Sequence, residues 1–211
     1  MKISHCISLI LIVFLLSCKS DPVRISDLKE ENGRFLYKGS PFTGTAITTN
    51  GDSVLLSNNY LNGSLNGESI EYFANGKVKD RKNYKEGKMD GKRAEFYESG
   101  QLKKTMNYSS GLYEGELLVH YENGEKMMKG EYRNSKEEGE WSYYSEKGML
   151  TKRIHYANGS PEGKWEYYDD NGRIKSSIDF KNGKKNGLWI EFDSTGKTVR
   201  EVRYKEDELE K

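Results

Sequence analysis

The sequence predicts an all-β protein, an elongated and open antiparallel meander of stacked 24-residue β-hairpins. Glycines recur every 24 residues, aromatic residues recur at the same interval, and the short segments between them show no helical periodicity. The clearest glycine series is Gly67, Gly91, Gly115, Gly139, Gly163 and Gly187. A second series, Gly76, Gly100, Gly124, Gly148, Gly172 and Gly196, marks a turn within each unit.

Residues 1–17 have the features of a secretory signal peptide. Lys2 supplies a positive start, and residues 7–16 form an almost wholly apolar run. A helix that spans a bilayer needs about 20 apolar residues, so this run is too short to serve as a membrane span. We therefore expect the chain to be exported and residues 1–17 to be removed.

The end of this segment, Leu15-Leu16-Ser17-Cys18, resembles the bacterial lipobox. The resemblance implies that Cys18 becomes the mature N-terminus and the site of lipid attachment. Two or more acyl chains hold a protein stably on a bilayer, whereas one chain binds only marginally. We therefore expect a membrane-anchored lipoprotein of the bacterial cell envelope, facing the periplasm or the outside.

Residues 18–36 are expected to form a lipid-anchored linker followed by an N-terminal cap. Residues 19–23 are the linker, and Leu28 and Phe35 are predicted to close the first repeat.

Residues 37–204 are predicted to contain seven repeats, of which the first is degenerate and has a shorter turn at Asn50-Gly51. Seven hairpins supply about fourteen strands, which at ~4.8 Å per strand form a ribbon on the order of 65 Å long. Residues 205–211 are a charged tail that we expect to fray.

The unit that starts at Gly163 shows the expected hairpin most clearly. A short aromatic strand ends at Tyr168, and Asp170-Asn171-Gly172 provides a turn that needs positive φ at glycine. On the second strand, alternation predicts that Ile174, Ile178 and Phe180 share one face. A lone hairpin is marginal in water, so stability must come from stacked neighbours.

Charge excludes one class of partner. The chain has 34 Lys and Arg against 33 Asp and Glu, and the predicted removal of residues 1–17 takes away Lys2 alone. The mature chain would then be neutral, unlike the basic surface of a nucleic-acid-binding protein. We therefore expect no nucleic-acid partner.

No motif in the chain predicts catalysis, a metal or a cofactor. His120 replaces an aromatic residue at a repeat position, and His155 is expected to face solvent on a second strand. Carboxylates are spread over all units, and no nucleophile-elbow motif is present. The segment 169–172 lacks the ligand spacing of a calcium loop. The protein is therefore expected not to be an enzyme.

The three tryptophans, Trp141, Trp165 and Trp189, fall at one position of the repeat. They are expected to stack as a ladder between hairpins. The alternative is that some of them line an exposed face that binds a protein strand or a glycan.

The repeat itself resembles a known family. The pattern G-x-W-x-x-Y/F…N-G…Y-x-N-G-x-x-x-G, clearest over 163–187, is similar to the bacterial MORN repeat variant, in chains grouped as YwqK-like antitoxins. The likeness extends over about 27–204. It implies a twisted open meander used for scaffolding or for contact with proteins or lipids, and the antitoxin label implies neutralisation of a toxin.

These observations predict a non-enzymatic, lipid-anchored envelope protein that presents a binding or scaffold surface to a protein partner. One alternative is an antitoxin, which the export signal at Cys18 would make an immunity-like protein of the envelope. Another is a glycan-binding module that uses exposed aromatic residues. Fold alone does not decide between them.

Overall fold

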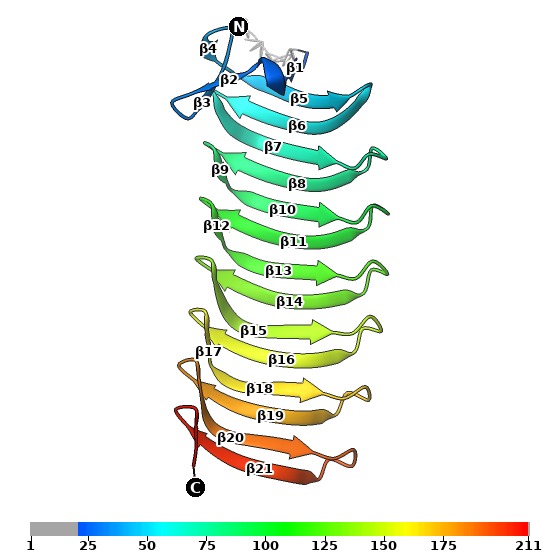
Figure 1. Ribbon diagram of the computed structural model, residues 1–211, viewed down its shortest axis with the longest axis vertical. Helices are drawn as coiled ribbons and strands as arrows, with labels where there is room; N and C mark the ends of the chain where they lie inside the picture. The colour runs from blue at the N-terminus through cyan, green and yellow to red at the C-terminus, as the bar shows by residue number, and fades with distance from the viewer. Residues whose placement is uncertain (1–20, 211) are drawn as a thin grey trace, which may run out of the picture.

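The computed structural model describes residues 21–210 and shows one long sheet with a small N-terminal cap (Figure 1). Fourteen long strands form seven successive hairpins. These are β5 (Gly44–Asn50) with β6 (Ser53–Leu61), β7 (Ser64–Tyr72) with β8 (Val78–Lys85), β10 (Gly91–Phe96) with β11 (Leu102–Ser109), β13 (Gly115–His120) with β14 (Lys126–Arg133), β15 (Lys136–Tyr144) with β16 (Leu150–Ala157), β18 (Gly163–Tyr168) with β19 (Ile174–Lys181), and β20 (Lys184–Phe192) with β21 (Thr198–Lys205).

Every pair of neighbouring long strands is antiparallel, from β5–β6 at one end to β20–β21 at the other. Four two-residue strands pair with the long strand that precedes each: β9 (Lys88–Met89), β12 (Leu112–Tyr113), β17 (Ser160–Pro161) and β22 (Glu208–Leu209). The predicted fold class, an open antiparallel meander of stacked hairpins, is confirmed.

The two turns of each unit differ in geometry. Between units, two consecutive residues have positive φ, such as Asn182 at 51° and Gly183 at 83°, which is typical of a type I′ hairpin turn. In the turn within each unit, only the glycine has a positive φ, as Gly172 does at 77°. Its N–H donates to the carbonyl of Asp169 at 3.0 Å, which closes a tight turn. The predicted positive φ of the within-unit glycines is confirmed.

A β-bulge recurs just before each within-unit turn and changes which side chains share a face. Tyr167 pairs with Ser176, but the next residue, Tyr168, pairs with Ile174, so the second strand holds one extra residue. The prediction that Ile174 shares a face with Ile178 and Phe180 was therefore wrong. Ile174 pairs with Tyr168 and shares its face of the sheet, while Ile178 pairs with Trp165 and shares the other face.

Successive units are tied together along the edge where the between-unit turns lie. Each turn donates a backbone N–H to a carbonyl of the preceding unit, as Gly63 does to Phe42 at 2.8 Å and Gly183 to Pro161 at 2.9 Å. Four carboxylates also accept a turn N–H from the next unit: Asp90 from Ser110 at 3.0 Å, Glu114 from Asn134 at 2.9 Å, Glu138 from Asn158 at 2.9 Å, and Glu162 from Asn182 at 2.8 Å. We call these four the stapling carboxylates.

The N-terminal cap covers one end of the sheet (Figure 1). Strand β1 (Val23–Arg24) pairs in parallel with β5, a short 3-10 turn (Ile25–Asp27) follows, and a small separate sheet is formed by β2 (Lys29–Glu31), β3 (Arg34–Tyr37) and β4 (Ser40–Pro41). Leu28 and Phe35 pack against a cluster of Phe42, Ala46 and Tyr60. These are the two residues expected to close the first unit.

Residues 205–210, part of the tail that we expected to fray, instead form a turn and a short returning strand. Lys205 still belongs to β21, and β22 pairs with it through Tyr204–Leu209 and Lys205–Glu208. The N–H of Asp207 donates to the carbonyl of Lys185 at 3.0 Å. The repeat geometry therefore continues past the last full strand, because this segment supplies its own turn and a returning strand.

Candidate binding surface

One face of the sheet carries a continuous row of aromatic rings, which we call the ladder face. The rings pack mostly edge-on or tilted, with centroids 4.5 to 6.1 Å apart, as aromatic pairs prefer. In order along the array they are Tyr108, Tyr113, Tyr132, Trp141, Tyr156, Trp165 and Phe180. The rings from Tyr108 to Trp165, together with Met106, Leu117 and Ile154, belong to the main core cluster of the array.

The three tryptophans occupy different environments on this face. Trp141 is only 3 % exposed, so it is not available to a ligand. Trp165 is half-buried between Tyr156 and Phe180. The guanidinium of Arg200 lies 4.5 Å from the ring centre of Trp189, which is also half-buried. All three tryptophans pack against other aromatic rings, since the ring centre of Trp189 lies 6.2 Å from that of Tyr204. Trp189 differs from the other two in that the guanidinium of Arg200 also lies over its ring.

Gly130 makes room for Trp141. A Cβ atom at Gly130 would lie 2.2 Å from the indole ring, far inside van der Waals contact. Equivalent positions in neighbouring units hold Met106 and Ile154, which fill this space themselves. The unit with the smallest residue therefore accepts the ring that penetrates most deeply, and the burial of Trp141 depends on that glycine.

A charged cluster replaces the rings in the second and third units. Arg93 occupies the repeat position that Trp141 holds two units later, and it forms a two-pronged pair with Asp80, at 3.1 Å from Nε to Oδ1 and 2.8 Å from Nη2 to Oδ2. The Asp80 side chain is 8 % exposed. Lys82 lies 3.0 Å from Asp80, and Glu95 lies 3.0 Å from Arg93.

This cluster is neutralised from within. The hydrogen bond to Asp80 raises the pKa of Arg93 and keeps it charged. Every charge has an opposite partner, so the cluster specifies local packing and offers no free charge for chemistry. The sequence interpretation missed it, although an arginine at the tryptophan position of the repeat was the available signal.

A second charged group lies on the opposite face. Arg153 lies 3.5 Å from both Glu140 and Glu166, and Tyr168 donates a hydrogen bond to Glu166 at 2.8 Å. Burial, followed by this hydrogen bond, raises the pKa of Tyr168 to about 12. His155, whose side chain is 42 % exposed, is 3.7 Å from Glu140. Both carboxylates are held by the same arginine, and Glu140 also accepts a hydrogen bond from the hydroxyl of Ser142 at 3.1 Å.

His120 has a different environment from His155. Its side chain is partly buried at the aromatic position of its unit, and its carbonyl accepts a hydrogen bond from the hydroxyl of Tyr97 at 2.7 Å. The Nδ1 atom is buried without a hydrogen-bond partner among the described residues. This environment fits a structural role for the side chain.

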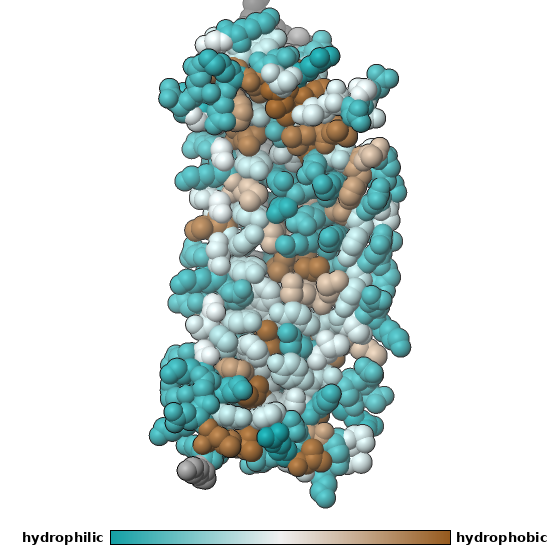
Figure 2. All heavy atoms as spheres, viewed as in Figure 1, coloured by the Kyte–Doolittle hydropathy of each residue, from teal (hydrophilic) through white to brown (hydrophobic). Residues whose placement is uncertain are grey.

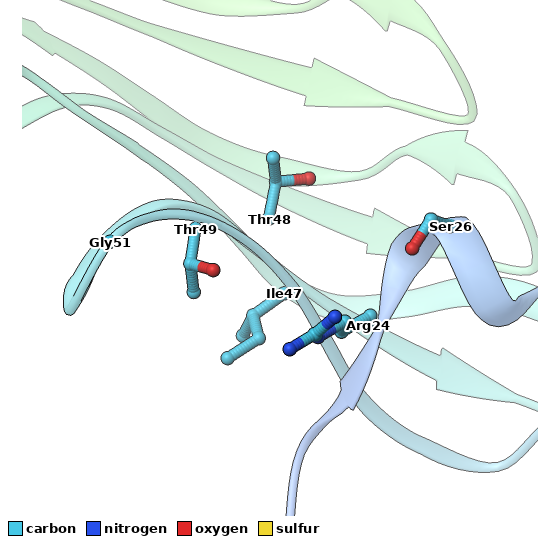
Figure 3. Close-up of a pocket in the computed structure, with 6 residues that line it drawn as sticks. All are labelled: Arg24, Ser26, Ile47, Thr48, Thr49 and Gly51. Atoms are coloured by element: carbon cyan, nitrogen blue, oxygen red, sulfur yellow. The ribbon is translucent and has the colours of Figure 1, made fainter.

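The hollows on the surface are shallow. One, of about 410 Å³, lies where β1 meets β5 and is lined by Arg24, Ser26, Ile47, Thr48, Thr49 and Gly51 (Figure 3). Figure 3 shows the side chains of Thr48 and Thr49 pointing to opposite sides of the strand, so their hydroxyls do not converge. The hollow therefore lacks the focused set of groups that catalysis requires.

The exposed surface is mixed in character. Figure 2 shows hydrophobic residues gathered near both ends of the array and in a band across its middle, with hydrophilic residues along the two long sides. Within residues 21–210 no group of His, Cys, Asp and Glu is arranged to hold a metal ion. In the same range no helix is long and apolar enough to cross a membrane. Cys18 lies outside the described residues.

Comparison with known protein families identifies the repeat as the MORN repeat variant. The model of the MORN repeat variant matches residues 65–86, 89–110, 137–158, 161–182 and 185–206, just over half of the chain. The unit passed over, residues 113–134, is the one that carries His120 and Gly130. No curated protein matches the chain.

Proposed function

We propose that this chain, which belongs to the MORN repeat variant family, is a lipid-anchored envelope protein that presents its sheet to a protein partner. The observation that carries the proposal is the single-layer architecture. Among the described residues, strands β7 to β21 contact their neighbours in the sheet, and no helix or second sheet packs on either face. Such a sheet leaves two broad faces available for contact.

The distribution of side chains supports a binding role over catalysis. Ionised groups are paired within the sheet, as in the Asp80–Arg93 and Glu166–Arg153 pairs. Half-buried aromatic side chains such as Trp165 and Trp189 recur from unit to unit. Aromatic residues with partial exposure are frequent at protein interfaces. A repeat array spreads its contacts over several units, so we expect no single Asp, Glu or His to be essential.

The anchor at Cys18 orients the array. Only four residues separate Cys18 from Val23, which begins β1, and so few residues reach at most roughly 20 Å. The capped end would therefore stay near the bilayer, and the hairpins would extend away from it. A partner would then meet the later units farther from the membrane.

The first test concerns the anchor. Cys18→Ala should abolish acylation and release the protein from membranes, because no other cysteine follows residue 18. Fractionation and mass spectrometry of the native protein measure both effects, with Ser17→Ala as the control that keeps a small residue before the cysteine. An intact Met1 or an unmodified Cys18 in the native protein would refute the anchored form.

The second test concerns the surface. Deleting one whole unit, Ala157 to Phe180, should leave a folded array that is shorter by roughly 10 Å and captures its partner less well. Small-angle scattering measures the length, and co-purification from membranes measures capture. Identification of the captured protein as a toxin would narrow the role to immunity.

Two outcomes would contradict the surface model. Unchanged capture by the shortened array would remove residues 157–180 from the binding surface. Complete loss of function through one carboxylate, with fold and capture intact, would instead indicate an enzyme.

A further inference from the structure

The chain contains ten Asn–Gly dipeptides, eight of which lie in turns. They are 32–33, 50–51, 62–63, 66–67, 75–76, 123–124, 158–159, 171–172, 182–183 and 186–187. Asparagine before glycine is chemically labile, because the missing side chain of glycine lets its backbone nitrogen approach the asparagine carboxamide. The structure determines which of the ten can react.

The reaction is an intramolecular acyl transfer followed by hydrolysis. The glycine backbone nitrogen loses its proton and attacks Cγ of asparagine, so that a C–N bond forms and ammonia leaves. Water then opens the cyclic imide at either carbonyl and yields aspartate or isoaspartate. No oxidant or cofactor is consumed. The nitrogen must therefore be free to give up its proton, and a hydrogen bond from that N–H opposes the first step.

Six of the glycines donate that N–H to a backbone carbonyl. In the between-unit turns, Gly63, Gly159 and Gly183 donate to the preceding unit at 2.8 to 2.9 Å. In the within-unit turns the pairs are Gly76 to Phe73 at 2.9 Å, Gly124 to Tyr121 at 3.0 Å, and Gly172 to Asp169 at 3.0 Å. Gly67 and Gly187 lie inside β7 and β20.

Gly33 and Gly51 are the exceptions among the glycines that lie in turns. Within residues 21–210 neither N–H meets a hydrogen-bond acceptor, and neither the Asn32 nor the Asn50 side chain makes a hydrogen bond. All four residues are exposed to water. The turn of Gly33 has no preceding unit to accept its N–H, and Gly51 lies in the shorter turn between β5 and β6, where Asn50 pairs directly with Ser53.

The comparison of two turns isolates the hydrogen bond from the backbone geometry. Asn32 and Gly33 have φ of 51° and 73°, and Asn62 and Gly63 have φ of 48° and 79°. The two turns thus have nearly the same shape. They differ in the bond from Gly63 to Phe42, which Gly33 lacks.

We propose that Asn32 and Asn50 are sites of spontaneous deamidation in the folded protein, and that the backbone hydrogen bonds of the glycine N–H groups protect the other Asn–Gly turns. Each conversion places a carboxylate at the capped end. At Asn50 the new charge arises beside Gly51, at the tip of the turn that borders the hollow of Figure 3. Isoaspartate would also lengthen the backbone of that turn by one atom.

Peptide mapping by mass spectrometry tests the proposal. The purified, folded chain is incubated in mildly alkaline buffer made with oxygen-18 water, which labels each hydrolysed imide. Asn32 and Asn50 should convert at least about fivefold faster than Asn62, Asn158 and Asn182, the factor that one typical hydrogen bond supplies. Asn50→Gln should remove the signal at position 50 and leave position 32 unchanged.

The unfolded chain is the control for sequence. In concentrated urea Asn32 and Asn62 should react at similar rates, since the protecting bond is gone. Equal rates for these two residues in the folded protein would overturn the proposal, as would a folded protein in which neither Asn32 nor Asn50 converts.

Discussion

Trp141 packs into space that exists because Gly130 has no side chain. The two preceding units carry Leu117 and Arg93 at the same repeat position. This position therefore holds an ion-paired arginine, a buried leucine and a buried tryptophan in three successive units. A small residue opposite a large one conserves volume, as close-packed interiors require. The side chains that fill this position of the core therefore differ from one unit to the next.

Gly130→Ala should destabilise the array, although alanine usually strengthens a strand relative to glycine. The added carbon would fall 2.2 Å from the indole, and such overpacking costs about 1–3 kcal/mol. Urea unfolding followed by tryptophan fluorescence and circular dichroism measures the change. The same alanine in a Trp141→Leu background should cost much less, and equal costs in both backgrounds would show that the ring is not the obstacle.

At the scale of the hairpin, the stapling carboxylates determine how one turn is held to the next. Glu138, which is half-buried, accepts the Asn158 N–H at 2.9 Å, and its contribution is that of one modest hydrogen bond. The four staples recur with the repeat because each unit has the same turn. A single staple should therefore act locally.

Glu138→Ala should destabilise the hairpin of β15 and β16 by about 1 kcal/mol and speed hydrogen exchange at the Asn158 amide. Glu138→Gln keeps an acceptor oxygen and should restore most of the protection. Native-state hydrogen exchange resolves both variants. If the Asn158 amide exchanges equally fast in the wild type and in Glu138→Ala, the staple does not operate in solution.

The hairpin itself could be predicted from the sequence, whereas the bulge within it and the contacts between its strands could not. The spacing of glycines and rings predicted the meander and the positive φ at Gly172, because both depend on one residue type in one local geometry. The prediction of the sheet face on which Ile174 lies was wrong, because a bulge adds one residue to the strand and no particular residue type in the sequence marks it. The Asp80–Arg93 pair was missed because it joins different strands, and its partners are visible only once the strands are aligned.

Across the whole molecule, tyrosines hold much of the distributed core. Burial, with further contributions from neighbouring groups, raises the pKa of Tyr108, Tyr143 and Tyr168 to about 12, against 10.0 for a free tyrosine. The neutral phenol is thus the form that the folded array favours. Its stabilising contribution is complete below pH 10 and is lost as pH rises toward 12.

The array should therefore unfold over roughly pH 10 to 12, with these tyrosines ionising as the sheet is lost. Circular dichroism and tyrosinate absorbance, recorded on the same samples, should change together. Tyr143→Phe cannot ionise and should move the transition to higher pH. Full tyrosine ionisation near pH 10 with the sheet intact would show that these phenols are not buried in solution.

The order of the strands in the sheet is their order in the chain, and this has a mechanical consequence. A pull applied between residues 21 and 210 would load the strand-to-strand bonds in series, one strand after another. Folds whose terminal strands lie side by side resist such a pull in shear, with many bonds sharing the load. This array would instead peel in small steps at low force and recoil when released, which would make the sheet compliant along its length.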